Sequence, residues 1–428
     1  MCILGTEKQN NSKPEETPKM KQVTLYSSLF AVFLLLQAPL TFAQVSESWT
    51  QFRGPSRSGI STENITDSQI SDPAPELVWK KNIGCAFSEI TLAGDQLYTM
   101  LSEKTDSLSG WEYMAAFDAK TGEEIWRNQV DSIFIDPDDF GDGPRSTPLI
   151  GENTIFSFSS YGKLTAHSKS DGKQLWQVDF MKEFGSTLPR WGFSSSPVLV
   201  DGVLIMEAGG TESRAFVAFD QNTGKLLWAK GKGNASYCSP LVAEMDGQTQ
   251  IIFANQKTLS SYNSKGETLW TYTMKINGPT AMPTLIDSNK IFICTVRSSG
   301  FEIVKVKNDT VSEVLQAPTM KNDYSSTLYY DSHLYGFNVA ALQCISAETG
   351  EKKWTKRGFG KGSLILVGDK LLVLSDKGLL IQVKADPTAY TEQRRFQAIK
   401  GKSWTAPSFV NGKIYLRNQT EMACYKFN

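Results

Sequence analysis

Short runs of alternating apolar and polar residues recur along the chain, and tight-turn residues separate them. The hairpins 197–205 and 407–415 are the clearest cases, because each places an Asp-Gly or Asn-Gly pair between two apolar runs. Such pairs adopt the positive φ angles that a two-residue β-hairpin requires. Similar hairpins are predicted over 92–98, 149–156, 241–253, 285–292, 328–335 and 364–373.

A second repeated unit lies between these hairpins. It is FDAKTGEEIW at 117–126 and FDQNTGKLLW at 219–228, with weaker copies that end at Trp176, Trp270 and Trp354. An Asp, Asn or Ser side chain can bond to backbone N–H groups two residues on, and Gly supplies a positive φ. The unit therefore predicts a tight turn and then a strand carrying a large aromatic residue. The residues that define the repeat are Trp79, Asp118, Gly122, Trp126, Trp176, Asp220, Gly224, Trp228, Trp270, Gly350 and Trp354.

The aromatic positions are evenly spaced. With degenerate equivalents near Leu315 and Phe396 there are eight, about 45 residues apart, which is typical of four-stranded propeller blades. Eight such sheets in a ring bury one another's faces and leave only short edges. We therefore predict an all-β fold, an eight-bladed β-propeller of four-stranded antiparallel blades over 76–428. The first strand, 76–80, should complete the C-terminal blade at 403–427 and close the ring.

The N-terminal part of the chain has a different pattern. A charged stretch, an apolar run over 29–36 and small residues up to Ala43 follow one another, which predicts a secretory signal peptide over 1–43 with a start at Met20. The apolar run is short for a membrane anchor, which must cross about 30 Å of hydrocarbon. No cysteine follows it closely, as a lipid anchor would require. We expect an N-terminal extension over 44–75 and a periplasmic or secreted, monomeric mature chain without a membrane span.

Charge and residue counts narrow the chemistry. There are 44 Lys and Arg against 45 Asp and Glu, so the chain lacks the basic excess of a nucleic-acid-binding protein. Two histidines cannot build a multi-histidine metal site, and no acid, base and nucleophile constellation is apparent, so neither catalytic nor metal-binding residues are assigned. Five isolated cysteines are expected to be small buried hydrophobic residues in strands, and their odd number leaves at least one free thiol. They are Cys85, Cys238, Cys294, Cys344 and Cys424.

The repeat has a family resemblance. The pattern A-x-D-x-x-T-G-x-x-x-W at 116–126 and 218–228 resembles that of the PQQ-like (pyrroloquinoline-quinone-like) propeller repeat family. The sequence WTQFRGP at 49–55 is similar to the segment before the propeller in many exported members. The resemblance implies one of two classes: quinoprotein dehydrogenases, which bind PQQ and Ca²⁺ on the propeller axis, or non-catalytic proteins similar to the assembly factor BamB. The adjacent Cys-Cys pair of the alcohol-dehydrogenase members is missing here.

Propeller sites lie on the axis, where the inner strand of each blade begins. A proline or an equivalent residue marks the start of the inner strand in each blade. The residue three positions before it should lie near the axis, and in several blades this residue is aromatic or cationic. Such a ring could bind an anionic or planar ligand, or could simply line a wet channel. The candidate ligand-binding residues are Arg145, Trp191, Tyr237, Tyr324, Lys361 and Trp404, with Glu89 as a possible Ca²⁺ ligand if PQQ is bound.

Three long loops, 101–111, 129–146 and 178–195, should cluster on one face over the first three blades, where binding residues tend to lie. The acidic run 136–143 departs from EF-hand spacing at Phe140 and is expected to be a solvated loop. The leading hypothesis is an exported, non-enzymatic scaffold that binds a protein or ligand in the cell envelope, without a cofactor. One alternative is a quinoprotein-type oxidoreductase with PQQ and Ca²⁺, and another is a carbohydrate-binding or lyase-type propeller.

Overall fold

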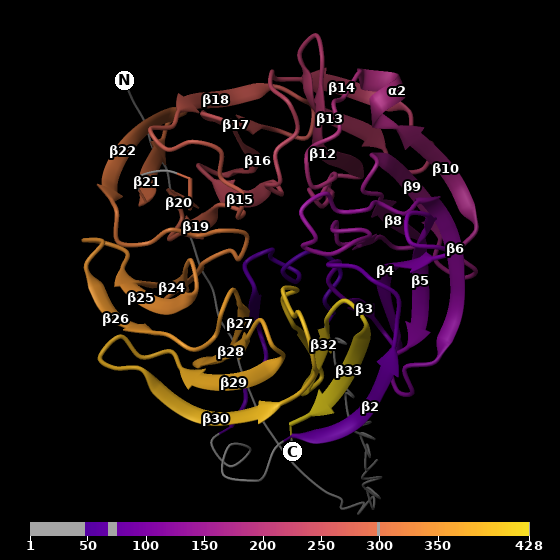
Figure 1. Ribbon diagram of the computed structural model, residues 1–428. Helices are drawn as coiled ribbons and strands as arrows, with labels where there is room; N and C mark the ends of the chain where they lie inside the picture. The colour runs from indigo at the N-terminus through magenta and orange to yellow at the C-terminus, as the bar shows by residue number, and fades with distance from the viewer. Residues whose placement is uncertain (1–47, 67–74, 298–299, 428) are drawn as a thin grey trace, which may run out of the picture. The chain divides into compact units, whose positions relative to one another are not determined.

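Eight antiparallel sheets stand around a common axis in the computed structural model, which describes residues 48–66, 75–297 and 300–427 (Figure 1). Residues 46–428 make up one compact unit, and the predicted signal peptide over 1–43 lies outside the described residues. Each sheet is one blade, numbered here from 1 to 8 along the chain. The predicted eight-bladed all-β architecture is confirmed.

The first four blades lie between residues 91 and 273. Their strands are β3 (Thr91–Ala93), β4 (Gln96–Lys104), β5 (Gly110–Asp118) and β6 (Glu124–Ser132) in blade 1; β7 (Leu149–Ile150), β8 (Thr154–Phe158), β9 (Lys163–Ser168) and β10 (Gln174–Asp179) in blade 2; β11 (Val198–Val200), β12 (Val203–Gly210), β13 (Arg214–Asp220) and β14 (Leu226–Lys230) in blade 3; and β15 (Leu241–Met245), β16 (Gln248–Asn255), β17 (Thr258–Tyr262) and β18 (Thr268–Thr273) in blade 4. A short helix, α2 (Phe180–Phe184), follows β10.

The last four blades complete the ring. Their strands are β19 (Thr284–Ile286), β20 (Lys290–Thr295), β21 (Gly300–Lys307) and β22 (Thr310–Ala317) in blade 5; β23 (Leu328–Tyr330), β24 (His333–Asn338), β25 (Ala341–Ser346) and β26 (Lys352–Lys356) in blade 6; β27 (Ser363–Val367), β28 (Lys370–Leu374), β29 (Leu379–Lys384) and β30 (Thr391–Gln397) in blade 7; and β31 (Ser408–Val410), β32 (Lys413–Arg417), β33 (Glu421–Lys426) and β2 (Glu76–Asn82) in blade 8.

The ring closes as the sequence predicts. Strand β2, from the start of the described ring, is the outermost strand of blade 8 and pairs antiparallel with β33. Blade 7 contains a strand that the repeat does not predict, because β1 (Ile60–Ser61), from the N-terminal extension, pairs parallel with β27 at its inner edge.

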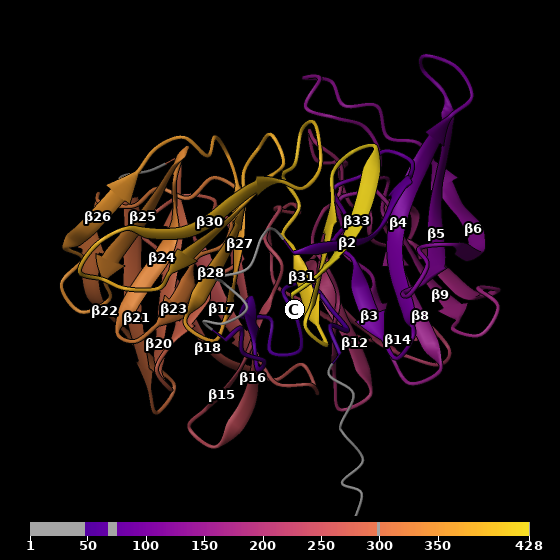
Figure 2. The ribbon, with the colours of Figure 1, turned by 90° about the horizontal axis from the view of Figure 1, so that it is seen from below.

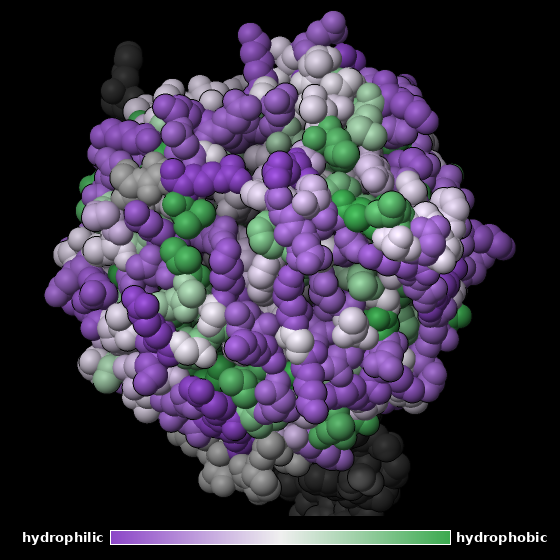
Figure 3. All heavy atoms as spheres, viewed as in Figure 1, coloured by the Kyte–Doolittle hydropathy of each residue, from purple (hydrophilic) through white to green (hydrophobic). Residues whose placement is uncertain are grey.

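Polar side chains predominate on the face viewed along the axis (Figure 3).

The repeated turn has the geometry that its sequence requires. The Oδ1 atom of Asp118 accepts bonds from the backbone N–H groups of Lys120 and Thr121, at 2.8 Å each. Asp220 makes the same bonds to Asn222 and Thr223. The turn held by these bonds requires a positive φ at the residue two positions before the outer strand. A glycine stands at that position in both turns.

In four of the turns the glycine also packs against a tryptophan of the neighbouring blade, whereas Gly350 packs against Phe301 and Leu315. A Cβ atom on Gly224 would lie 2.6 Å from the Trp176 ring, and one on Gly122 would lie 2.8 Å from the Trp79 ring. The indole nitrogen of Trp176 then donates to the carbonyl of Gln221 at 3.1 Å, in the same turn. Equivalent Trp–Gly pairs join Trp126 to Gly172 and Trp228 to Gly266. The repeat is therefore a contact between blades.

The apolar core lies between neighbouring blades. One buried cluster, for example, combines Tyr98 and Met114 of blade 1 with Ile155 of blade 2. Four of the five described cysteines are buried in these layers, Cys85 is half-buried, and all five are free thiols. This agrees with their expected role as small hydrophobic residues.

A matched pair of substitutions tests the contact between blades. Gly224 and Gly247 both have a positive φ, but a Cβ atom on Gly247 would meet nothing within 4 Å. Both Gly→Ala changes incur the same backbone strain, and only Gly224→Ala also pushes on the Trp176 ring. We expect Gly224→Ala to lower the free energy of unfolding by about 1–3 kcal/mol more than Gly247→Ala, measured by urea denaturation. Equal losses would contradict the proposed role of the glycine.

Candidate functional site

The N-terminal extension crosses one end of the propeller axis. Trp49 forms a β-bridge with Leu92 of blade 1, and the carbonyl of Thr50 accepts a bond from Ile150 of blade 2. Further along, β1 joins blade 7, and the Glu63 carboxylate accepts bonds from the backbone of Asn411 and Gly412 in blade 8. We refer to residues 49–63 as the axial plug.

Two buried arginines of the axial plug contact three further blades. The Arg53 guanidinium donates to the carbonyls of Ser58, Ser326 and Thr327, and the last two precede blade 6. Arg57 donates to the carbonyls of Pro197 and Pro240, which precede blades 3 and 4. Burial lowers the pKa of Arg53 to about 10 and that of Arg57 to about 9, and both groups remain charged at neutral pH. The axial plug therefore contacts seven blades.

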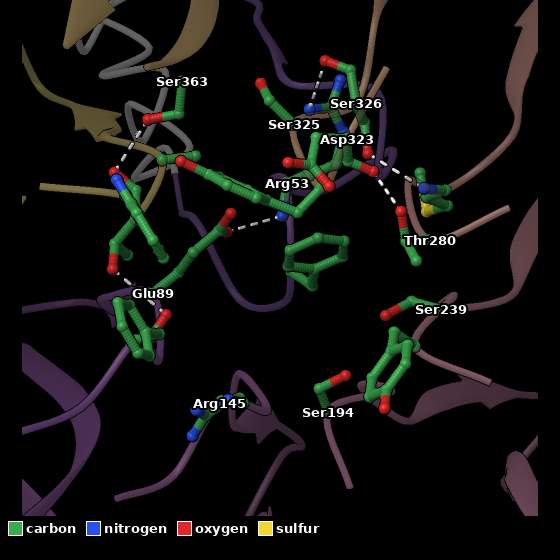
Figure 4. Close-up of a pocket in the computed structure, with 18 of the residues that line it drawn as sticks. Arg53, Glu89, Arg145, Ser194, Ser239, Thr280, Asp323, Ser325, Ser326 and Ser363 are labelled. Atoms are coloured by element: carbon green, nitrogen blue, oxygen red, sulfur yellow. Dashed lines mark hydrogen bonds between the residues drawn. The ribbon is translucent and has the colours of Figure 1, made fainter. Parts of the chain in front are cut away.

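A cavity of about 320 Å³ lies on the axis and has the plug residues Phe52 and Arg53 in its wall (Figure 4). All six candidate ligand-binding residues line it: Arg145, Trp191, Tyr237, Tyr324, Lys361 and Trp404. The structure therefore brings together side chains from six parts of the chain. Whether they bind a ligand stays a prediction.

Each charged residue in the cavity wall is engaged by another group of the protein. Arg145 pairs with Asp136, and burial lowers the pKa of the arginine. Lys361 pairs with Asp323 at 2.5 Å. The Glu89 carboxylate accepts a 2.8 Å bond from the backbone nitrogen of Arg53 and faces the charge of that arginine. The wall is therefore charged but nearly balanced.

Aromatic rings make up much of the rest of the wall. Trp404 stacks on Phe87, with ring centroids 5.7 Å apart, and lies against Tyr324 at 5.3 Å. Trp191 lies 5.2 Å from Tyr237, and the amide of Trp191 donates to the Tyr237 hydroxyl. All five rings are half-buried, so part of each remains uncovered.

Hydroxyl side chains join the blades around the base of the cavity. The backbone nitrogen of Glu89 bonds to the hydroxyl of Thr147, that of Thr147 to Ser196, and that of Ser196 to Ser239. Ser326 accepts the equivalent bond from Met282. This belt of hydroxyl groups was not predicted from the sequence. The signal was present, because Thr147, Ser196 and Ser239 each come directly before an inner-strand proline.

The acidic loop 136–142 is not the solvated loop that was expected. Asp136 is buried against Arg145, Asp142 pairs with Lys104 at 2.7 Å, and Asp138 pairs with Arg190. Asp138 also accepts a 2.7 Å bond from the indole nitrogen of Trp191. The ion pairs of these carboxylates therefore hold the loop in place. The described residues contain no group of three or more potential metal-ligating side chains.

The loop 136–142 places Phe140 at the rim of the cavity. The Phe140 ring lies 6.1 Å from Trp191 and 5.9 Å from Trp404, and 39% of its surface is exposed. The Lys402 ammonium donates to the Phe140 carbonyl at 2.7 Å. The hairpin β4–β5 stands beyond its neighbouring strands near the same loop, to which Lys104 ties it (Figure 2). The three long loops of the first blades thus meet, as expected, and we call this region the rim.

Comparison with known proteins places the chain among PQQ-type propellers. Residues 112–356 match the family described as outer membrane protein assembly factor BamB. The BamB of Shewanella oneidensis is 26% identical over 258 residues, which are 56% of this chain and 63% of that protein. The quinoprotein alcohol dehydrogenase PedH of Pseudomonas putida is 26% identical over 182 residues, 41% of this chain and 27% of the enzyme. The chain therefore spans less than two thirds of the length of either relative.

Solved structures agree on the fold. BamB from Moraxella catarrhalis superposes with a TM-score of 0.61 at 14% identity, over 83% of this chain and 98% of that one. At such low identity the likeness establishes the propeller alone.

The buried Glu89 side chain gives a pH-dependent prediction. Burial raises its pKa from 4.5 to about 7, so the proton is held more tightly in the folded state than in the unfolded state. This contribution to stability is complete below about pH 4.5 and is lost as the pH rises through about 7. Glu112 and Glu207 are buried with the same shift and act in the same direction. Glu89→Gln should reduce the loss of unfolding free energy between pH 5 and 8 by about 2–3 kcal/mol, measured by urea denaturation at both pH values. An unchanged pH dependence would contradict it.

Proposed function

The chain belongs to the family of the outer membrane protein assembly factor BamB, and on that premise we propose that it is an exported, non-enzymatic binding scaffold of the cell envelope. Export rests on the predicted signal peptide over 1–43. None of the helices in the described ranges is long and apolar enough to cross a membrane. We propose that the axial cavity and the rim are the binding surfaces.

The pairing of charges in the cavity is the observation that carries this proposal. A catalytic acid, base or nucleophile must be free to exchange a proton or attack a substrate. Here Asp136 holds Arg145, and Asp323 holds Lys361. Both pairs orient side chains, and Glu89, whose pKa lies near neutral, accepts a bond from the backbone of the axial plug. That arrangement is suited to holding a ligand without transforming it.

The match to PedH favours the quinoprotein alternative. The cavity must therefore be compared with what PQQ needs from a binding site. PQQ carries several carboxylates, and its Ca²⁺ ion needs several oxygen ligands at once. The cations that could receive the carboxylates, Arg145 and Lys361, are already paired. Glu89, the candidate Ca²⁺ ligand, is bonded to the axial plug. The residues present do not fit this cofactor.

The first test adds PQQ and Ca²⁺ to the purified protein. We expect no binding heat by titration calorimetry and no dye reduction with alcohols or aldoses. Because the paired cations would have to break their bonds to accept the carboxylates, Asp136→Asn, which frees Arg145, serves as a sensitised variant. Dye reduction by the wild-type protein that depends on PQQ would contradict the non-enzymatic proposal.

The second test concerns the protein partner. The rim exposes apolar side chains on ordered loops, namely Phe140, the Leu108 side chain with 76% of its surface exposed, and Trp111 at 41%. Ordered exposed apolar groups of this kind are typical of protein-binding sites. We expect Phe140→Ser to reduce capture of the partner from an envelope extract by about tenfold or more. The control Val314→Ser changes a side chain of similar exposure on the outer strand β22 and should leave capture unchanged. Equal capture by both variants would remove the rim from the proposal.

A further inference from the structure

The wall of the axial cavity keeps aromatic surface open that the fold itself does not need. Trp191, Tyr237, Tyr324 and Trp404 all line the cavity and are only half-buried, although apolar cores elsewhere in the ring are closed. Aromatic side chains gathered in one concave site, with a few polar groups among them, are characteristic of small-molecule binding. At about 320 Å³, the cavity lies at the lower end of the usual range of about 300–1,000 Å³.

The charge balance of the wall restricts which molecule could fit. A strongly anionic ligand would lie beside the carboxylates of Asp323 and Glu89, and a cationic one beside Arg145 and Lys361. In a half-buried site, such like-charge contacts and the breaking of existing pairs both oppose binding. A neutral ligand meets neither penalty, and charged pairs still form strong hydrogen bonds to neutral hydroxyl groups.

Hydroxyl groups with unused bonding capacity line the same cavity. Ser194 and Ser325 both line the cavity, and their side-chain hydroxyls make no hydrogen bond to any other described residue (Figure 4). The Tyr237 hydroxyl accepts a bond from the Trp191 amide, so its proton remains available to donate. Together with Asp323 and Lys361, they offer both donors and acceptors around the wall.

We propose that the axial cavity binds a neutral pyranose, as a single sugar or one end of a short saccharide. The C–H face of a pyranose ring is slightly positive and packs on the negative face of an aromatic ring, while its hydroxyls need donors and acceptors around the edge. A purely aromatic ligand would leave the hydroxyl and charged groups of the wall without partners, which weakens binding. The inference rests on the proposed function, since it assigns a ligand class to a site that binds without catalysis.

The experiment measures binding of defined sugars to the full-length protein. Calorimetry and tryptophan fluorescence, to which Trp191 and Trp404 contribute, are recorded with methyl glucoside, N-acetylglucosamine and maltose. Glucuronate and glucosamine are the matched charged probes, and indole is the aromatic probe. We expect at least one neutral sugar to bind with a dissociation constant of about 0.1–1 mM, and both charged sugars to bind about tenfold more weakly.

Two variants and a control sharpen the result. Trp404→Ala should weaken sugar binding about tenfold, whereas Leu175→Ala, which changes an exposed side chain on the outer strand β10, away from the cavity and the rim, should leave it unchanged. Should Trp404→Ala fail to fold, Asp323→Asn tests the same idea. It removes one carboxylate beside Lys361, so the preference should shift from the neutral sugar toward glucuronate.

Several outcomes would overturn the inference. These are a folded protein that binds none of the neutral sugars, one that binds glucuronate or indole more tightly than them, or an Asp323→Asn variant with unchanged preference. A different measurement tests the proposed function, because PQQ-dependent dye reduction would contradict it. A protein that binds no sugar and reduces no dye therefore rejects the pyranose alone.

Discussion

The packing of a large apolar side chain, in four cases a tryptophan ring, against the glycine of the next blade's turn is the interaction on which contact between blades depends. It explains why three features recur together in the sequence: an aspartate that shapes the turn, a glycine that leaves space, and an aromatic residue about four positions later. The Asp220 bonds set the turn, and Gly224 leaves room for Trp176 of the preceding blade. A blade made of this unit is complete only beside another. The repeat therefore encodes association between units, and the antiparallel pairing of β2 with β33 ends the series by closing it.

The interior of the ring follows another principle. Charged groups near the axis are matched within the protein, as with Arg145 and Asp136 or Lys361 and Asp323. Buried ionic groups are stable only when they are paired and hydrogen-bonded, so this matching is what permits a charged wall in a half-buried site. In the function proposed here, this pairing leaves the charged groups of the wall to orient a ligand instead of holding a cofactor. The same fold can thus carry either kind of site.

The architecture and the axial ring were predictable from local patterns, whereas the plug and the acidic loop were not. A turn signal such as Asp201-Gly202 acts over two residues, and its meaning does not depend on distant parts of the chain. The axial ring was found because the blades repeat, so a position in one blade predicts its equivalent in the next. Arg57 illustrates the opposite case, since its partners Pro197 and Pro240 lie far away in sequence and are backbone carbonyls, which leave no pattern. Asp136 was expected in solvent because nothing near it indicates the buried arginine it meets.

The path of the axial plug has a consequence for biogenesis. Residues 49–63 hold seven blades, and β2 must wait for β33, which lies at the opposite end of the ring's sequence. The plug and β2 are therefore synthesised before several of the blades with which they pair. The two arginines stay in water until the blades that hold their partners are made, and the edge of β2 stays unpaired until β33 is made, so other chains can reach both. Successful maturation should therefore be limited by how well a nascent chain is shielded during this wait.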